Sequence, residues 1–194
     1  MKKFLFTTTL LFIGLIVFSQ SVNWLKTYGV SGGETRDLAI DVHGNIYAVG
    51  SANNRNMVIN GVPVNTMGGF DAFVVKYSPD GELIWFKPIG GAGTDVGLQI
   101  EADTNSKIYV SIFSNSSPLR VADSSLSSAV AGILRFDSSG TFEKVLTTGM
   151  TVYDMKYYMG SLFFRTFGNT LFKSNLNGGT IWSKPISGSN FLNN

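Results

Sequence analysis

Few side chains in this sequence are of the types that carry out catalysis. The 194 residues include one histidine, His43, and no cysteine, which excludes thiolate chemistry and clusters of histidine ligands. A Ser-His-Asp triad would depend on His43, yet no G-x-S-x-G motif accompanies it. Because His43 lies in the turn-like stretch DVHGN, we expect it on the surface, and we predict no catalytic, cofactor-binding or metal-binding residue.

Aspartates are the remaining candidates for chemistry. Asp37, Asp95 and Asp154 each fall near the start of a similar alternating apolar stretch. Aspartates repeated in this way could bind a cation or a sugar hydroxyl, or they could accept backbone N–H bonds at turns. We favour the second role. The stretch DTNSK from Asp103 faintly resembles a calcium loop, but it lacks the central glycine and the distal glutamate.

Two long polar inserts, residues 51–69 and 114–131, are the candidates for recognition. Loops on a rigid scaffold commonly carry binding sites. Both inserts are rich in asparagine and serine, which suits a glycan or a protein partner at the cell surface; the alternative is a solvated loop or a decorative β-ribbon. The candidate recognition residues are Asn53, Asn54, Arg55, Asn60, Asn115 and Arg120.

A recurring phrase indicates which elements position these residues. WFKPIGG begins at Trp85, WSKPISG at Trp182, and a looser copy, WLKTYGV, at Trp24. Alignment on this phrase defines three units, at approximately residues 30–89, 90–148 and 149–187. Each unit contains alternating apolar stretches separated by Gly, Asn or Asp turns, which is the pattern of β-hairpins. We therefore predict an all-β fold in which each unit is a four-stranded antiparallel meander, like a β-propeller blade.

The phrase is predicted to form the last strand of each unit. Proline cannot donate to a strand ladder, so Pro88 and Pro185 favour an outer edge strand. Alternation places Trp85 and Lys87 on one face, with the tryptophan between neighbouring units and the lysine reaching water. About three blades plus an outer strand at residues 24–28 make an incomplete ring, because closed propellers use about four to eight blades. Three explanations for the incomplete ring stay open. The chain is a fragment of a longer protein, its units form an open arc, or copies of it associate through uncovered blade faces.

The N-terminus has the layout of a secretory signal peptide. Residues 1–19 run from a basic start through an apolar stretch to a small polar residue, Ser19. The apolar stretch, residues 4–18, is shorter than the about 20 residues that a membrane span needs. We predict that residues 1–19 are removed and that residues 20–194 form an exported β-propeller repeat domain, secreted or at the cell surface, with no membrane span.

Composition agrees with an extracellular β-rich protein. Charged residues make up 14% of the chain, against roughly 25% in ordinary domains, while glycine and aromatic residues are plentiful. The formal net charge of +2 comes from Lys2 and Lys3. No basic stripe remains that could contact phosphates, so nucleic acid is not an expected partner.

One stretch resembles a known repeat family. GNIYAVGS, GGFDAFVVKYSPDGELIW and GGAGTDVGLQI occur in order within residues 44–103, and this region is similar to the bacterial β-propeller repeat (SBBP) family. The second unit keeps part of the pattern and the third matches in outline, while the signal peptide resembles those of Bacteroidetes-type bacteria. The resemblance implies a propeller fold, export and no catalytic residues. We expect an exported non-enzymatic module for binding or scaffolding; the alternative is part of a propeller-fold hydrolase or lyase.

Overall fold

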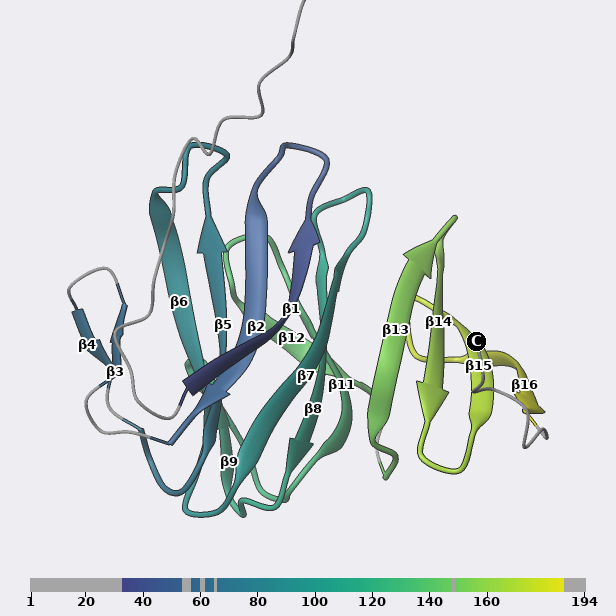
Figure 1. The fold of residues 1–194 in the computed structure, drawn as a ribbon. Helices are drawn as coiled ribbons and strands as arrows, with labels where there is room; N and C mark the ends of the chain where they lie inside the picture. Colours follow the sequence, from purple (N-terminus) through teal and green to yellow (C-terminus); the bar gives the residue numbers. More distant parts are fainter. Residues whose placement is uncertain (1–32, 54–56, 60–61, 65, 148, 187–194) are drawn as a thin grey trace, which may run out of the picture.

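Three antiparallel β-sheets lie one after another along the chain (Figure 1). The computed structural model describes residues 33–53, 57–59, 62–64, 66–147 and 149–186, and all secondary structure in them is β. The sheets contain six, four and four strands, and none of them is closed. The predicted all-β fold of four-stranded antiparallel meanders is therefore confirmed. The predicted signal peptide and the predicted strand at residues 24–28 lie outside the described residues.

Sheet I holds the first meander and a hairpin from the second insert. Its strands β1, β2, β5 and β6 follow one another in chain order, and they span Gly33–Ile40, Ile46–Ala52, Asp71–Tyr77 and Leu83–Gly90. The second insert adds a hairpin beyond β6, formed by β9 (Leu119–Val121) and β10 (Ser124–Leu126). The first insert contains a separate two-stranded ribbon of β3 (Met57–Ile59) and β4 (Val62–Val64).

Sheets II and III repeat the same meander without additions. Sheet II is built from β7, β8, β11 and β12, which span Asp95–Ala102, Ile108–Ser114, Ala131–Phe136 and Phe142–Thr147. Sheet III is built from β13, β14, β15 and β16, which span Val152–Tyr158, Ser161–Thr166, Thr170–Asn175 and Thr180–Pro185. Short turns join neighbouring strands throughout sheet III, whereas in sheet II the second insert, with β9 and β10, separates β8 from β11.

Of the three apolar cores in the described residues, two lie on the two faces of sheet II, and the third belongs to sheet I. Successive residues of a strand point to opposite faces, and Val110 packs in the core with Tyr47 of sheet I, whereas Tyr109 packs in the core with Met155 and Phe164 of sheet III. All five side chains are almost fully buried. Sheet II is therefore the central layer, covered on both faces (Figure 1).

Trp85 packs between sheets I and II, as predicted. Its ring centroid lies 5.8 Å from that of Tyr47, and its Nε1 donates a hydrogen bond of 3.1 Å to the carbonyl oxygen of Ser138, in the β11–β12 turn. Lys87 follows on the same face, with its Nζ 3.3 Å from the carboxylate of the exposed Asp123. The WFKPIGG copy of the recurring phrase thus forms a contact between sheets I and II.

The prediction that the fourth strand forms a free edge is wrong for the end of β6. β9 pairs with β6 at Ile89 and Gly90, and Ala122 N donates a hydrogen bond of 3.0 Å to the carbonyl oxygen of Pro88. Because that carbonyl faces β9, the proline nitrogen also faces away from β5, and its missing N–H removes no bond to β5. In sheet III, β16 is the last strand of the described part, as predicted.

Candidate functional site

The ends of the two predicted recognition inserts meet at the link between sheets I and II. Gly69 N donates a hydrogen bond of 3.0 Å to Gly93 O, and Asn115 N donates one of 3.1 Å to Thr94 O. A groove of about 370 Å³ opens there. We call it the insert groove, and it is lined by Met67, Gly91, Ala92, Pro118 and Arg120.

The predicted recognition residues are spread over different environments. Arg120 is exposed and lines the insert groove. Asn115 is exposed, but its Oδ1 accepts a hydrogen bond of 2.6 Å from Thr94 N, so it helps to hold the link between the sheets. Asn53 is exposed just beyond β2. The others, Asn54, Arg55 and Asn60, lie outside the described residues.

The aspartates that the sequence aligned do not occupy equivalent positions. Asp37 and Asp154 each follow a register shift in the first strand of their sheet, but the corresponding residue of sheet II is Gln99 rather than Asp95. Asp37 Oδ2 accepts a hydrogen bond of 2.9 Å from Ile100 N, which ties β1 to β7. Asp37 thus accepts a backbone N–H bond, but from another sheet and from within β1 rather than at a turn, so the predicted turn role is wrong for this residue.

Asp95 and Asp71 are buried and hold the backbone around the insert groove. Asp95 Oδ2 accepts a hydrogen bond of 2.8 Å from Gly91 N, and Asp71 Oδ2 accepts hydrogen bonds from Met67 N and Gly68 N. Within the described residues, the Oδ1 atom of each aspartate has no hydrogen-bond partner. Burial raises the pKa of Asp71 against the opposing effect of its hydrogen bonds, and the nearby charge of Asp95 raises it further.

Replacing Asp71 with asparagine should stabilise the fold by about 1 kcal/mol at pH 7. The pKa of Asp71 is raised above 3.8 by folding, so the folded state binds the proton more tightly. The stability contributed by this group is present below pH 3.8 and is lost as the pH rises through the folded pKa. The neutral amide keeps an oxygen acceptor and avoids that loss.

Urea unfolding of Asp71→Asn at pH 4 and pH 7 tests this prediction, and the gain should be larger at pH 7. The exposed turn residue Asp80 provides the control, because Asp80→Asn should change stability little at either pH. An Asp71→Asn variant that loses stability, and loses more at pH 7 than at pH 4, would contradict the prediction by showing that the ionised carboxylate is needed.

A second site arises from a bulge that recurs in the first strand of every sheet. The register shifts once in β1, once in β7 and once in β13, and the residues left unpaired are Arg36, Leu98 and Tyr153. A bulge bends its strand and re-aims a side chain. All three residues line one cleft of about 280 Å³, which we call the bulge cleft. Equivalent positions of the three meanders therefore converge on one place.

The bulge cleft combines apolar walls, exposed rings and one cation. Its other lining residues are Val96, Phe113 and Thr151. Tyr153 is 41% exposed and Phe113 is 40% exposed, so both rings are accessible to a ligand. Arg36 Nε donates a hydrogen bond of 2.6 Å to Oε1 of Glu34, so the arginine charge is compensated by a neighbouring carboxylate.

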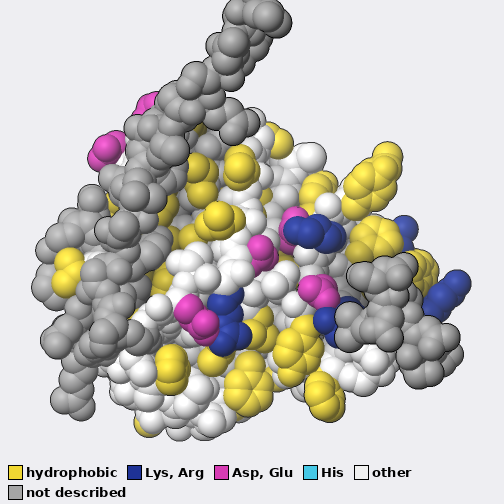
Figure 2. Space-filling view, in the orientation of Figure 1, with side chains coloured by type: hydrophobic (Ala, Val, Ile, Leu, Met, Phe, Trp, Pro, Cys, Tyr) yellow, Lys and Arg dark blue, Asp and Glu magenta, His cyan; other side chains and the backbone are white. Residues whose placement is uncertain are grey.

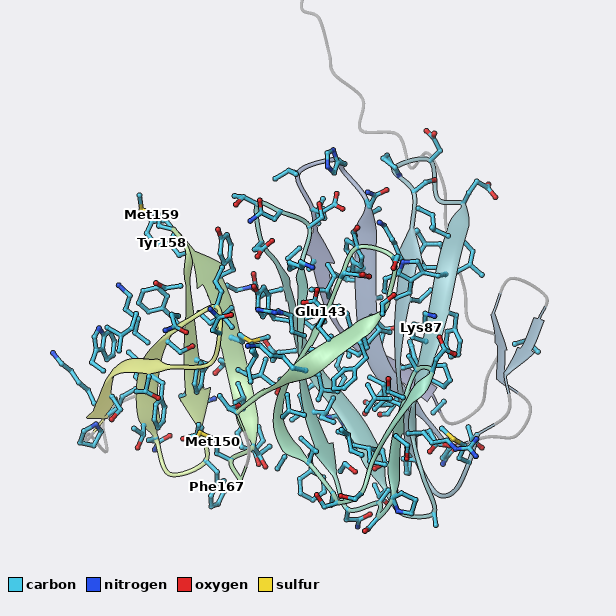
Figure 3. The ribbon with its side chains drawn as sticks, turned by 180° about the vertical axis from the view of Figure 1, so that it is seen from behind. Lys87, Glu143, Met150, Tyr158, Met159 and Phe167 are labelled. Atoms are coloured by element: carbon cyan, nitrogen blue, oxygen red, sulfur yellow. The ribbon has the colours of Figure 1, made fainter. Side chains whose placement is uncertain are left out.

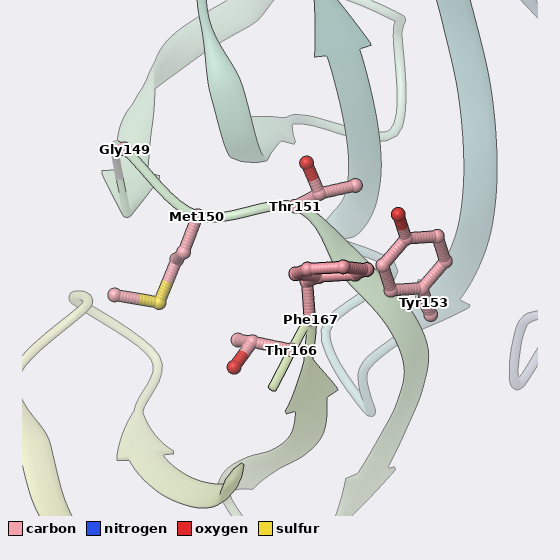
Figure 4. A pocket seen from close by; sticks show the side chains of 6 residues that line it. All are labelled: Gly149, Met150, Thr151, Tyr153, Thr166 and Phe167. Carbon is pink, nitrogen blue, oxygen red and sulfur yellow. The ribbon is translucent and has the colours of Figure 1, made fainter. Parts of the chain in front are cut away.

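A hollow of about 460 Å³ continues the bulge cleft along sheet III (Figure 4). It shares Thr151 and Tyr153 with the cleft and adds Gly149, Met150, Thr166 and Phe167. Phe167 is 82% exposed, and its ring centroid lies 6.3 Å from that of Tyr153, with 49° between the planes. Figure 4 shows these two rings beside each other, with Thr151 and Thr166 on either side. In Figure 2 hydrophobic side chains gather toward the sheet III side of the visible face.

Sequence reasoning missed the bulge cleft. A bulge adds one residue to a strand without breaking its apolar pattern, and Arg36, Leu98 and Tyr153 share no side-chain type that would have aligned them. The available signal was Phe167, a large apolar residue directly before the turn at Gly168, where burial is not expected.

The described ranges contain no group of three or more histidine, aspartate and glutamate side chains placed to hold a metal ion. No helix in that part of the chain is long and apolar enough to cross a bilayer. His43 is exposed in the β1–β2 turn, where its backbone N–H donates a hydrogen bond of 2.9 Å to Asp41 Oδ1, as expected of a surface turn residue.

Comparison with known proteins gives a structural likeness alone. No protein-family model matches the chain, and no curated protein matches its sequence. Among solved structures, the chain is similar to a protein of unknown function from Bacteroides caccae, determined at 1.35 Å resolution, with a TM-score of 0.48 and 10% identity. The match covers 81% of this chain and 48% of the Bacteroides caccae protein, so this chain spans about half the length of that protein. Membership of the β-propeller repeat family stays a prediction.

Proposed function

We propose that the chain is an exported, non-enzymatic module of the β-propeller repeat type that binds a neutral saccharide in the bulge cleft and its adjoining hollow. The convergence of Arg36, Leu98 and Tyr153 on one cleft, with aromatic rings left exposed, carries this proposal. The signal-peptide pattern of residues 1–19 supports export, and the three meanders support the repeat architecture.

The chemistry of the cleft suits a sugar ring. Tyr153 and Phe167 offer flat apolar surfaces for the C–H face of a saccharide, and the tyrosine adds a hydroxyl group. The half-buried side chain of Thr151 can donate and accept hydrogen bonds to sugar hydroxyls. Ligand sites usually have this composition, a mainly apolar lining with a few placed polar groups. The pairing of Arg36 with Glu34 favours a neutral sugar over an acidic one.

Removing the two neighbouring rings of Tyr153 and Phe167 should weaken binding strongly. We expect Tyr153→Ala/Phe167→Ala to weaken binding to immobilised neutral oligosaccharides of glucose, xylose or mannose by more than about tenfold, because each ring supplies contact area that alanine lacks. Binding of the mature chain to this panel, measured by biolayer interferometry, provides the reference.

Tyr158 is the matched control for these rings. It is also an exposed aromatic residue of sheet III, 64% exposed, but it lies at the other end of the sheet from Phe167 (Figure 3). Tyr158→Ala should bind like the unmodified chain, and so should Arg120→Ala in the insert groove. Absence of binding to the whole panel, or an equal loss in Tyr158→Ala, would refute the proposal.

A further inference from the structure

Sheet I contacts sheet II through a row of three side chains that lie side by side on β2, β5 and β6. Tyr47 is paired with Lys76, and Lys76 is paired with Trp85. Lys76 Nζ lies 5.1 Å from the centre of the Tyr47 ring. Lys76 Nζ and Trp85 Nε1 both donate hydrogen bonds of 3.1 Å to the carbonyl oxygen of Ser138 in the β11–β12 turn. The row therefore holds the turn between the third and fourth strands of the next sheet.

Sheet II repeats this arrangement toward sheet III. The equivalent row is Tyr109, Arg135 and Lys144, paired in the same order. Arg135 Nη1 donates a hydrogen bond of 2.8 Å to Leu176 O, and Lys144 Nζ lies 3.4 Å from Asn177 O. Both acceptors lie in the β15–β16 turn, so the cations again hold the third turn of the following sheet.

Both held turns fit their row closely because they contain a glycine. Gly140 has a φ of +82°, and a side-chain carbon there would lie 2.9 Å from Lys87 Cε and 3.1 Å from the Trp85 ring. Gly178 has a φ of +93°, and a side-chain carbon there would lie 2.3 Å from Leu146 O. The turns have the form Asp-x-x-Gly and Asn-x-x-Gly, at residues 137–140 and 175–178.

Sheet III carries the same row on its outer face. Phe163, Lys173 and Trp182 are paired in the same order, with Lys173 Nζ 5.3 Å from the centre of the Phe163 ring and the Phe163 and Trp182 centroids 6.2 Å apart. Lys184 lies over the Trp182 ring as the counterpart of Lys87. In the described residues, these contacts all lie within sheet III, and no turn is held by the row.

We propose that this face of sheet III docks another protein that carries a four-stranded unit of the same build, with a Ser-, Asp- or Asn-x-x-Gly turn between its third and fourth strands. The two internal contacts show what such a row accepts: turn carbonyl oxygens for the cation and a glycine against the fourth strand. A second copy of this chain fits less well. Its turns at residues 137–140 and 175–178 are already held, and Gly81 of its remaining turn is already buried.

An added copy of sheet II provides the probe. Residues 90–147 are appended after Ile186, which has the place in WSKPI that Ile89 has in WFKPI before sheet II. Covalent attachment supplies the unit at high effective concentration. Amide hydrogen exchange in β15 and β16 should become at least about tenfold slower than in the unextended chain, because docking must open before those amides exchange.

Variants of the row make the test specific. Lys173→Glu/Trp182→Ser in the extended chain should return the exchange of β15 and β16 to the rate of the unextended chain. Ser183→Ala is the matched control: Ser183 pairs with Phe172 on the opposite face of β16, so the slower exchange should persist. Unchanged exchange after extension, or slower exchange that survives the double variant, would overturn the proposal. Protection of the unextended chain that rises with its own concentration would also overturn it, by identifying a second copy as the occupant.

Discussion

Replacing Trp85 with alanine should lower the free energy of unfolding by about 3 kcal/mol, whereas the same change at Trp182 should lower it by less than about 1 kcal/mol. The two residues begin the same phrase, but their neighbours differ. Trp85 packs on Tyr47 and donates a hydrogen bond to Ser138 of sheet II. Trp182 contacts Phe163 and Lys184, which both belong to its own sheet. Truncation at Trp85 therefore opens a space between two sheets, and truncation at Trp182 does not.

Urea unfolding followed by far-ultraviolet circular dichroism measures both changes. Trp85→Phe separates packing from hydrogen bonding, because it keeps an aromatic ring but loses the N–H, and it should cost about 1 kcal/mol. Equal losses for Trp85→Ala and Trp182→Ala would contradict the conclusion that the first alone lies between sheets in the described structure.

The strand order was predictable because it depends on local pattern. Alternating apolar residues and turns such as Asp80-Gly81 specify the hairpins that begin and end each meander, and in sheets I and II an insert separates the second strand from the third. The position of Trp85 followed from the same alternation, since its face is set by the residues on either side of it. Both predictions needed no information from distant parts of the chain.

The covered edge and the cleft were not predictable because they depend on distant segments. β9 has three residues, too few for a periodic signal, and it joins β6 through Ile89 and Gly90, about thirty residues earlier in the sequence. The bulge cleft requires three strands to bend at matching places, and a bulge residue has no fixed type. Of the predicted recognition residues, Arg120 lines the insert groove, because it lies on β9 and β9 pairs with the end of β6.

Replacing the buried turn residue Asp103 with alanine should lower the free energy of unfolding by about 3 kcal/mol. Its Oδ1 accepts hydrogen bonds of 2.8 Å from Asn105 N and 2.9 Å from Lys107 N, and its Oδ2 accepts one of 2.9 Å from the hydroxyl of Tyr109. Asp103 is 3% exposed, so water cannot easily replace these bonds. Burial and the hydrogen bond to Asp103 raise the pKa of the Tyr109 hydroxyl, which therefore stays protonated and able to donate.

The bond between this aspartate and tyrosine should appear as a coupling energy. Sheet I has the same pair, because Tyr47 OH donates a hydrogen bond of 2.9 Å to Asp41 Oδ2, whereas sheet III has Phe163 at the tyrosine position and no aspartate six residues before it. The carboxylate and the hydroxyl are absent together there, which avoids burying either group unpaired. We therefore expect Tyr109→Phe to cost about 1 kcal/mol alone and much less in an Asp103→Ala background. Equal costs of Tyr109→Phe in the two backgrounds, measured by urea unfolding, would show that the two side chains contribute independently.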